Sequence, residues 1–101
     1  MITATVRILS EAIAAFCKRN HVRKLSLFGS VLTERFGDNS DIDMLVEFDP
    51  EFGPGLLGIA GMEIELSEML GRKVDLRTAR DLSRYFRDQV VGAAVPQYER
   101  E

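Results

Sequence analysis

The sequence predicts an α+β fold in which helices are layered on a small mixed sheet of three to four strands. Two patterns of apolar residues support this prediction. In some segments they recur every three or four positions, as on one face of a helix, and in others at every second position, as on a strand. The two kinds of segment alternate, so the expected order is αβαβαβα. Because 101 residues are too few for two independent cores, we expect one domain spanning 1–101.

The first helix is expected over residues 3–19 and the first strand over residues 24–28. One apolar stripe of this helix is formed by Ile2, Val6, Leu9, Ile13 and Phe16. The polar residues Asn20 and His21 follow and end the helix. The segment "KLSLF" then places Leu25 and Leu27 on one face of a strand.

A short helix beginning at Ser30 and a strand over residues 41–48 are expected next. The apolar residues of "SVLTERF" have helical spacing, and Gly37 stands where a helix can end in left-handed backbone. The turn "GDNS" separates this helix from the strand "DIDMLVEF". One face of that strand carries Ile42, Met44, Val46 and Phe48.

A loop, a long helix and a third strand are expected in the second half of the chain. The loop at residues 49–55 holds two of the three prolines. The helix after it has an apolar stripe formed by Leu56, Ile59, Met62, Leu66, Met69 and Leu70. Gly71 ends this helix, and the strand "RKVDLRT" then places Val74 and Leu76 toward the core.

A final helix is expected after the third strand. Thr78 and Asp81 have the spacing of a capping box, in which two side chains bind the backbone at the start of a helix. Leu82, Phe86 and Val90 supply its apolar stripe. Pro96 limits this helix, because a proline within a helix removes a hydrogen bond and clashes with the preceding turn.

The composition excludes several classes of protein. The formal net charge of −3 disfavours general binding to nucleic acid, because phosphate backbones are repelled. The single cysteine cannot form an internal disulfide bond, and no apolar run approaches the ~18 residues of a membrane span. Arg7 and Glu11 interrupt the apolar N-terminal segment, so we expect no export signal. The expected protein is cytoplasmic and does not bind membranes.

Asp41 and Asp43 form the first part of a candidate site. Residues two apart on a strand point to the same side, so these carboxylates can share a divalent ion or flank a pair of ions. Mg²⁺ prefers carboxylate oxygens together with water and substrate phosphates. The alternative interpretation is a pair of solvated turn residues. A calcium loop starting at Asp38 is excluded, because Asp43 stands where that loop needs glycine.

Gly29 and Ser30 form the second part. Glycine lets the backbone approach a ligand closely, and Ser30 is expected at a helix start, where free N–H groups can bind phosphate. The alternative is that Ser30 only caps the helix after a tight glycine turn. If the first two strands are neighbours, this turn and the two aspartates meet at one edge of the sheet.

Asp75 is the third part. Its neighbours Val74 and Leu76 are expected to be buried, so the carboxylate faces the same side as the acidic edge of the sheet. The alternative is an ordinary surface aspartate that pairs with Lys73 or Arg77.

These motifs together resemble a known family. "LSLFGS", ten residues, "DID", an apolar strand and later "KVDLRT" are similar to the minimal nucleotidyltransferases (MNT) of the DNA polymerase beta superfamily, the antitoxin partners of HEPN toxins. The similarity spans about residues 24–90 and includes "GRKVDL" and "YFRD". It implies a polymerase-beta-type nucleotidyltransferase core.

The resemblance implies an enzyme with ATP as substrate and two Mg²⁺ ions. Asp41 and Asp43 would hold the two ions, and Asp75 would bind the catalytic ion and favour deprotonation of the attacking hydroxyl. Gly29 and Ser30 would hold the β- and γ-phosphates. The reaction would be an in-line displacement at the α-phosphorus with pyrophosphate as the leaving group.

The resemblance also implies a partner, a HEPN ribonuclease toxin that receives AMP on a tyrosine near its active site and is thereby neutralised. Two alternatives remain open. One is a non-catalytic antitoxin that blocks the toxin by stoichiometric binding, and the other is a nucleotide sensor that binds without transfer. Many relatives carry basic residues where this chain has Thr33 and Gly37, which predicts a weaker site unless Arg35 compensates.

Other polar residues receive no role in the site. His21 is expected to be a solvated turn residue and Cys17 a small buried apolar residue. The basic residues between positions 72 and 87 are expected to be mostly solvated surface. A phosphate-facing or partner-facing role for Arg77 or Arg80 stays open.

Overall fold

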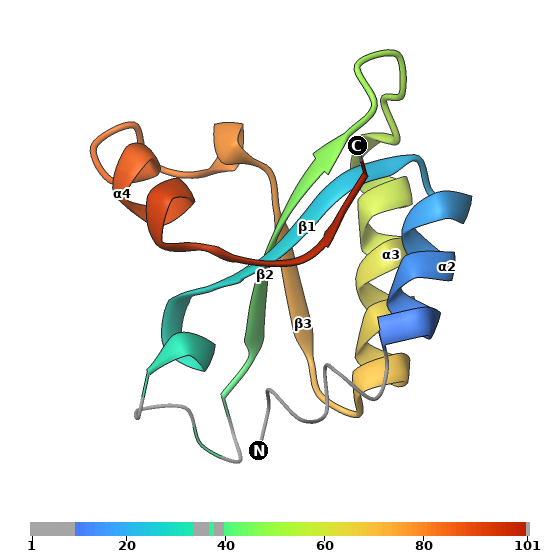
Figure 1. Ribbon diagram of the computed structural model, residues 1–101, viewed down its shortest axis with the longest axis horizontal. Helices are drawn as coiled ribbons and strands as arrows, with labels where there is room; N and C mark the ends of the chain where they lie inside the picture. Colours follow the sequence, from blue (N-terminus) through green and yellow to red (C-terminus); the bar gives the residue numbers. More distant parts are fainter. Residues whose placement is uncertain (1–9, 34–36, 38–39, 101) are drawn as a thin grey trace.

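The computed structural model describes residues 10–33, 37 and 40–100, and its helices on a four-stranded mixed sheet confirm the α+β prediction (Figure 1). The residues outside these ranges include Ile2, Val6 and Leu9 of the first expected stripe. In chain order the elements are α2 (Ser10–Arg19), β1 (Val22–Phe28), the 3₁₀ helix η1 (Gly29–Leu32), β2 (Ile42–Phe48), α3 (Gly55–Leu70), β3 (Val74–Arg77), the 3₁₀ helix η2 (Ala79–Asp81), α4 (Arg87–Ala93) and β4 (Val95–Glu99).

The strands lie side by side in the order β3-β2-β1-β4. β1 is antiparallel to both β2 and β4, whereas β2 and β3 are parallel. Two parallel strands cannot be joined by a tight turn, and here α3 makes the crossover between them. The sheet is therefore mixed, with β3 at one edge and β4 at the other.

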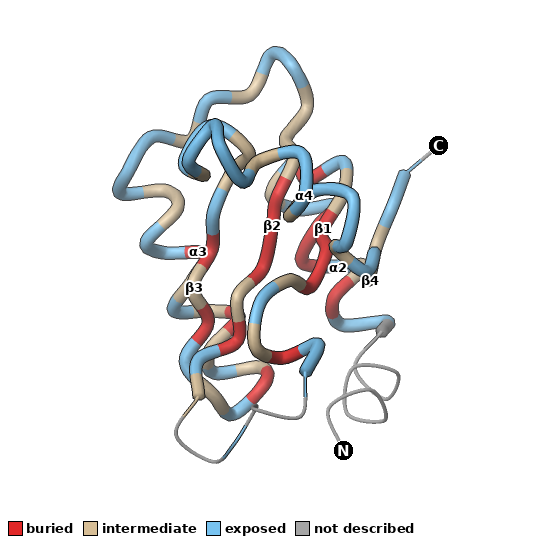
Figure 2. The backbone as a smooth tube through the Cα atoms, turned by 90° about the vertical axis from the view of Figure 1, so that its left-hand side faces the viewer, coloured by how far each residue is buried: buried red, intermediate tan, exposed pale blue. Residues whose placement is uncertain are grey.

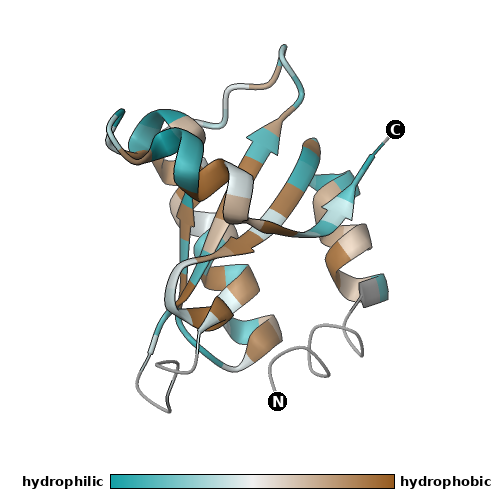
Figure 3. Ribbon diagram, turned by 60° about the vertical axis from the view of Figure 1, so that its left-hand side comes forward, coloured by the Kyte–Doolittle hydropathy of each residue, from teal (hydrophilic) through white to brown (hydrophobic). Residues whose placement is uncertain are grey.

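The core lies between one face of the sheet and the helices α2 and α3. The two helices pack side by side, and an ion pair between Arg19 and Glu65 joins them (Figure 1). Figure 2 shows buried backbone along β1 and β2, and Figure 3 shows hydrophobic residues in the middle of the sheet. The core consists of Ile13, Phe16, Cys17, Val22, Leu25, Leu27, Val31, Ile42, Met44, Val46, Met62, Leu66, Leu70, Val74 and Leu76.

The opposite face of the sheet is partly covered by η1, η2 and α4. Leu45 and Ser26 are buried there, while Asp43 and Asp75 are half-buried. Because side chains alternate along a strand, every second residue of β2 and β3 points to this more polar face. The candidate site therefore lies on the side of the sheet away from α2 and α3.

The second half of the chain contains a strand that was not expected. β4 follows α4 and pairs with β1 along the edge of the sheet, so the observed order continues beyond αβαβαβα. It contains Pro96, which the sequence pattern assigns only to the end of a helix. A proline is tolerated in an edge strand, where its missing N–H can face away from the neighbouring strand.

The last helix is shorter than expected. The capping box of Thr78 and Asp81 is confirmed, but it begins the three-residue η2 and not the long helix. Turns follow until α4 begins at Arg87, so Leu82 lies outside the helix and Phe86 is 61% exposed. The expected packing of Phe86 is therefore wrong.

The apolar stripe of α3 is confirmed for Met62, Leu66 and Leu70, which are buried, but not for Leu56, which is 87% exposed. A 16-residue helix is about 24 Å long, whereas the four-residue β3 spans only about 13 Å. The first turn of α3 therefore extends past the strand that it covers.

Two smaller expectations concern Cys17 and membranes. Cys17 is fully buried, as expected, and burial raises the pKa of its thiol to about 12. Among the helices in the described part of the chain, none is long and apolar enough to cross a membrane.

Leu66→Ala should lower the free energy of unfolding by about 2–5 kcal/mol, because Leu66 is fully buried beneath the sheet and its loss leaves a cavity. The matched control is Leu57→Ala in the same helix, where the side chain is 90% exposed and the change should stay within about 0.5 kcal/mol. Urea unfolding of both variants measures the difference. Equal losses would contradict the assignment of the buried face.

Candidate active site

Asp43 and Asp75 lie directly opposite each other on neighbouring strands. In the parallel pairing of β2 with β3, Asp43 is the register partner of Asp75, and Met44 is the partner of Leu76. Register partners point to the same face of a sheet, so the two carboxylates share the face away from the helices. Asp41 immediately precedes β2. We expected Asp75 to face the same side of the sheet as Asp41 and Asp43. The structure places all three aspartates at the same end of β2 and β3.

Side chains of α3 hold β3 in this register. The N–H groups of Val74 and Leu76 point outward from the edge of the sheet, where they would otherwise be unpaired. The hydroxyl of Ser67 accepts a hydrogen bond from the N–H of Val74 at 2.9 Å. Oε2 of Glu63 accepts one from the N–H of Leu76 at 2.7 Å. The edge strand is therefore fixed from both sides, and Asp75 with it.

Gly29 brings the turn after β1 against Asp43. Phe28, the last residue of β1, is the register partner of Asp43, and Gly29 follows with a φ of 77°. A Cβ at position 29 would lie 2.5 Å from Oδ2 of Asp43, which is closer than any real contact. Glycine is required here for two reasons, since it permits the left-handed backbone and leaves room for the carboxylate.

Ser30 lies in the 3₁₀ helix η1 and not at the start of an α-helix. The helix begins one residue earlier than expected, and its described part is only four residues long. The carbonyl of Ser30 accepts the backbone N–H and the hydroxyl of Thr33, both at 2.9 Å. A phosphate site at this turn would thus depend on local N–H groups and little on a helix dipole. Arg35, the expected compensating cation, lies outside the described residues.

Electrostatic repulsion is concentrated on Asp43. Partial burial raises the pKa of this carboxyl above its ordinary value of 3.8, and the neighbouring charges of Asp75 and Asp41 raise the pKa further. Arg77 opposes this shift. The outer carboxylates each have a cation nearby: Arg77 donates to Asp75 at 3.2 Å, and Nζ of Lys73 lies 3.9 Å from Asp41.

The donor set suits a hard cation, but the side chains are not arranged around one. Among residues 10–33, 37 and 40–100, no three acidic, histidine or cysteine side chains are close enough to hold one metal ion. Three carboxylates on one face are nevertheless ligands that Mg²⁺ prefers, and a divalent cation would relieve their repulsion. The side chains of Asp41 and Asp75 are 46% and 34% exposed, which leaves them room to turn toward Asp43.

Two hollows flank the aspartates. One of about 430 Å³ lies between the turn at Gly29 and α4, and is lined by Phe28, Gly29, Leu32, Thr33, Gln89, Val90 and Ala93. The other, of about 380 Å³, is lined by Asp75 and Arg77 of β3 together with Leu56 and Ile59 of α3. The contribution of α4 was not expected, because no local pattern in the sequence shows that this helix folds back over Gly29.

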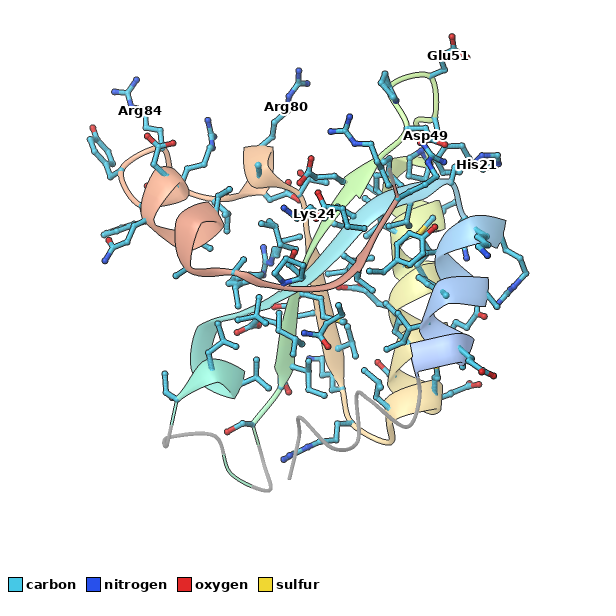
Figure 4. All side chains as sticks on the ribbon, viewed as in Figure 1. His21, Lys24, Asp49, Glu51, Arg80 and Arg84 are labelled. Atoms are coloured by element: carbon cyan, nitrogen blue, oxygen red, sulfur yellow. The ribbon has the colours of Figure 1, made fainter. Side chains whose placement is uncertain are left out.

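The remaining polar residues mostly agree with the expectations. His21 is exposed in a turn (Figure 4). Its ring stacks on that of Phe52, with centroids 4.6 Å apart. Arg80 and Arg84 project from the surface in the same figure. Arg87 is an exception among the basic residues, since its guanidinium donates to the carbonyls of Ala79 and Leu82 and thereby holds the segment between η2 and α4.

Residues 9–95, most of the chain, match the nucleotidyltransferase domain family. The chain belongs to this family. The nucleotidyltransferase is 35% identical over 77 residues to a predicted protein adenylyltransferase of Methanocaldococcus jannaschii, an alignment that covers 76% of this chain and 81% of the relative. It is also 37% identical over 59 residues to the protein adenylyltransferase MntA of Thermococcus cleftensis, an alignment that covers 58% of each protein.

Solved structures share the fold of this nucleotidyltransferase. A structure described as a minimal nucleotidyltransferase has a TM-score of 0.77 at 33% identity and covers 95% of this chain and 96% of its own. A toxin–antitoxin complex with AMP-PNP has a TM-score of 0.71 at 23% identity, over 91% of this chain and 74% of that one. A complex of an MNT antitoxin with a tri-AMPylated HEPN toxin of Shewanella oneidensis has a TM-score of 0.64 at 21% identity. This match covers 94% of this chain and 73% of that one. The resemblance to minimal nucleotidyltransferases is confirmed.

Gly29→Ala should lower the free energy of unfolding by about 2–4 kcal/mol, because a Cβ there strains the backbone and also collides with Asp43. The matched control is Gly71→Ala, where φ is 70° and no atom lies within 4 Å of the added Cβ. That variant should lose only about 1 kcal/mol. In an Asp43→Ala background, the cost of Gly29→Ala should fall to that of Gly71→Ala in urea unfolding; an unchanged cost would contradict the collision.

Asp43→Asn should raise the melting temperature of the metal-free protein at pH 7. Because the folded-state pKa of Asp43 is raised, the folded state binds this proton more tightly than the unfolded chain. The stability contribution is therefore present at acidic pH and is lost as pH rises above about 4. The gain from Asp43→Asn should shrink toward pH 3, as measured by thermal melts across pH. Glu51→Gln, an exposed loop change, is the control and should show no such trend.

Proposed function

We propose that this nucleotidyltransferase transfers AMP from ATP to a tyrosine of a HEPN ribonuclease toxin and so neutralises it. The named relatives support transfer of an adenylyl group to protein, because two of them carry that activity in their names. Toxin–antitoxin complexes among the structures of the same fold support a toxin as the acceptor. We expect a cytoplasmic protein that works in a complex with its toxin.

The observation that carries the proposal is the meeting of Asp43, Asp75 and Gly29. Asp43 and Asp75 are register partners, and a Cβ at position 29 would lie 2.5 Å from Oδ2 of the Asp43 carboxylate as it is placed here. A turn that approaches a carboxylate so closely can hold a phosphate next to a metal ligand. A purely structural turn would not need paired, mutually repelling carboxylates beside it.

Each residue has a role in this reaction. Asp41, Asp43 and Asp75 would hold Mg²⁺, which supplies charge neutralisation for the phosphates and a lower pKa for a bound hydroxyl. Gly29 and Ser30 would bind the β- and γ-phosphates through backbone N–H groups. Asp75 would favour deprotonation of the tyrosine hydroxyl. The tyrosine oxygen then bonds to the α-phosphorus, and the bond from that phosphorus to the pyrophosphate breaks.

The surface beside Asp75 suits a protein acceptor. Leu56 and Leu57 lie in the first turn of α3 and are 87% and 90% exposed, and Leu56 lines the same hollow as Asp75. Adjacent exposed leucines are typical of a surface that a partner covers. A toxin that packs on them would bring its tyrosine to the carboxylates.

A second candidate function is an antitoxin that blocks its toxin by binding alone. One observation favours it: Lys73 lies near Asp41 and Arg77 contacts Asp75, so these two carboxylates are paired with cations and do not point toward a shared metal position. A weak or unused metal site would have this appearance.

The decisive experiment incubates the toxin with ATP, Mg²⁺ and this protein and measures the intact mass of the toxin. We expect one or more AMP units to be added. Asp41→Ala combined with Asp43→Ala should lower the rate at least about 100-fold, because metal binding contributes several kcal/mol to such reactions. Glu47→Gln is the matched control on β2, since Glu47 pairs with Arg23 away from the aspartates.

The same variants separate the two functions. Loss of neutralisation while the toxin still binds supports catalysis. Full neutralisation by the double variant, with no mass added to the toxin, would show that binding alone is sufficient.

A further inference from the structure

Three carboxylates and two cations share the end of the sheet that carries the candidate site. Asp43 is repelled by the charges of Asp75 and Asp41, and the charge of Arg77 opposes this repulsion. Asp41 and Asp75 each have a cation nearby: Lys73, which directly precedes the neighbouring strand β3, lies near Asp41, and Arg77, two positions along β3, contacts Asp75. The cluster is thus partly neutralised by the protein itself.

Arg77 is the better placed of the two cations. It is the register partner of Leu45, two residues after Asp75, so its side chain lies on the same face as Asp43 and Asp75. Its Nη2 donates to Oδ2 of Asp75 at 3.2 Å, and its side chain is 48% exposed. An ion pair this exposed is weak because water solvates both charges, so the guanidinium can leave the carboxylate at little cost.

Lys73 makes a weaker contact. Its Nζ lies 3.9 Å from Asp41, and its side chain is 77% exposed. Lysine offers a single mobile ammonium, whereas arginine presents a planar fork that matches the oxygens of carboxylate or phosphate. Removing Lys73 should therefore have a smaller effect on the site than removing Arg77.

We propose that Arg77 is the resident counter-ion of Asp75, that a divalent metal displaces it, and that a phosphate of the bound nucleotide then receives it. This inference rests on the proposed function, because it assigns a positioning residue to the same site. Its physical basis is exchange of partners. A metal ion neutralises Asp75, which frees the guanidinium, and the triphosphate brings negative charge to the face of the sheet on which Arg77 lies.

This exchange of partners predicts that loss of Arg77 changes the affinities for metal and for nucleotide in opposite directions. Without Arg77, the metal no longer competes with a cation, so Mg²⁺ alone should bind Arg77→Ala about three- to tenfold more tightly than the native protein. A non-hydrolysable ATP analogue in saturating Mg²⁺ should bind about tenfold more weakly, because a charge-assisted hydrogen bond is lost. Arg77→Lys should restore part of the nucleotide binding.

Isothermal titration of the full chain measures both affinities. Lys73→Ala should shift the Mg²⁺ affinity in the same direction but by a smaller factor. Arg80→Ala is the control for loss of a nearby positive charge: Arg80 is exposed and lines a different groove, and its removal should change neither affinity by more than about twofold. Thermal melts check that each variant is folded.

The outcomes are separable. Mg²⁺ affinity that is absent, unchanged or reduced in Arg77→Ala overturns the counter-ion assignment, and unchanged nucleotide affinity overturns the phosphate assignment. If both affinities shift as expected but the toxin gains no AMP, the proposed transfer fails while the role of Arg77 stands.

Discussion

The parallel pairing of β2 with β3 is the constraint on which the site depends. It places Ile42 opposite Val74 and Met44 opposite Leu76 on the core side, so Asp43 must face Asp75 on the other side. A slip of one residue would turn an aspartate into the core and a leucine into solvent, at a cost of several kcal/mol. The hydrophobic core thereby sets the geometry of the charged groups on the other face of the sheet.

This arrangement holds like charges close together, which by itself is unfavourable. The core on the far side of the sheet, and the contacts of Glu63 and Ser67 with β3, keep the strands in place against that repulsion. The partial charge compensation by Lys73 and Arg77 limits the repulsion further. A site for a divalent cation and an anionic substrate would have these features, because carboxylates on one face of a sheet need only turn toward the ion to bind it.

The two candidate functions differ in how this charge balance is used. In a transferase, the cations near Asp41 and Asp75 yield to a metal and to phosphate. In a blocking antitoxin, they would remain and simply neutralise an acidic surface. The close approach of Gly29 to Asp43 favours the transferase. Neutralising an acidic surface does not require a backbone turn packed against one of its carboxylates.

Much of the fold and site follows from local sequence. Alternation identifies β2 and β3, the apolar stripe identifies most of α3, and the spacing of Gly29, Ser30, Asp41 and Asp43 marks the candidate site, because these patterns depend on neighbours along the chain. Contacts between distant segments were decided by the tertiary structure. It alone adds β4 as an edge strand despite Pro96, leaves Leu56 exposed, folds α4 over Gly29 and brings Lys73 near Asp41. Periodicity reports which face of an element is apolar, but which elements meet there depends on packing of the whole chain.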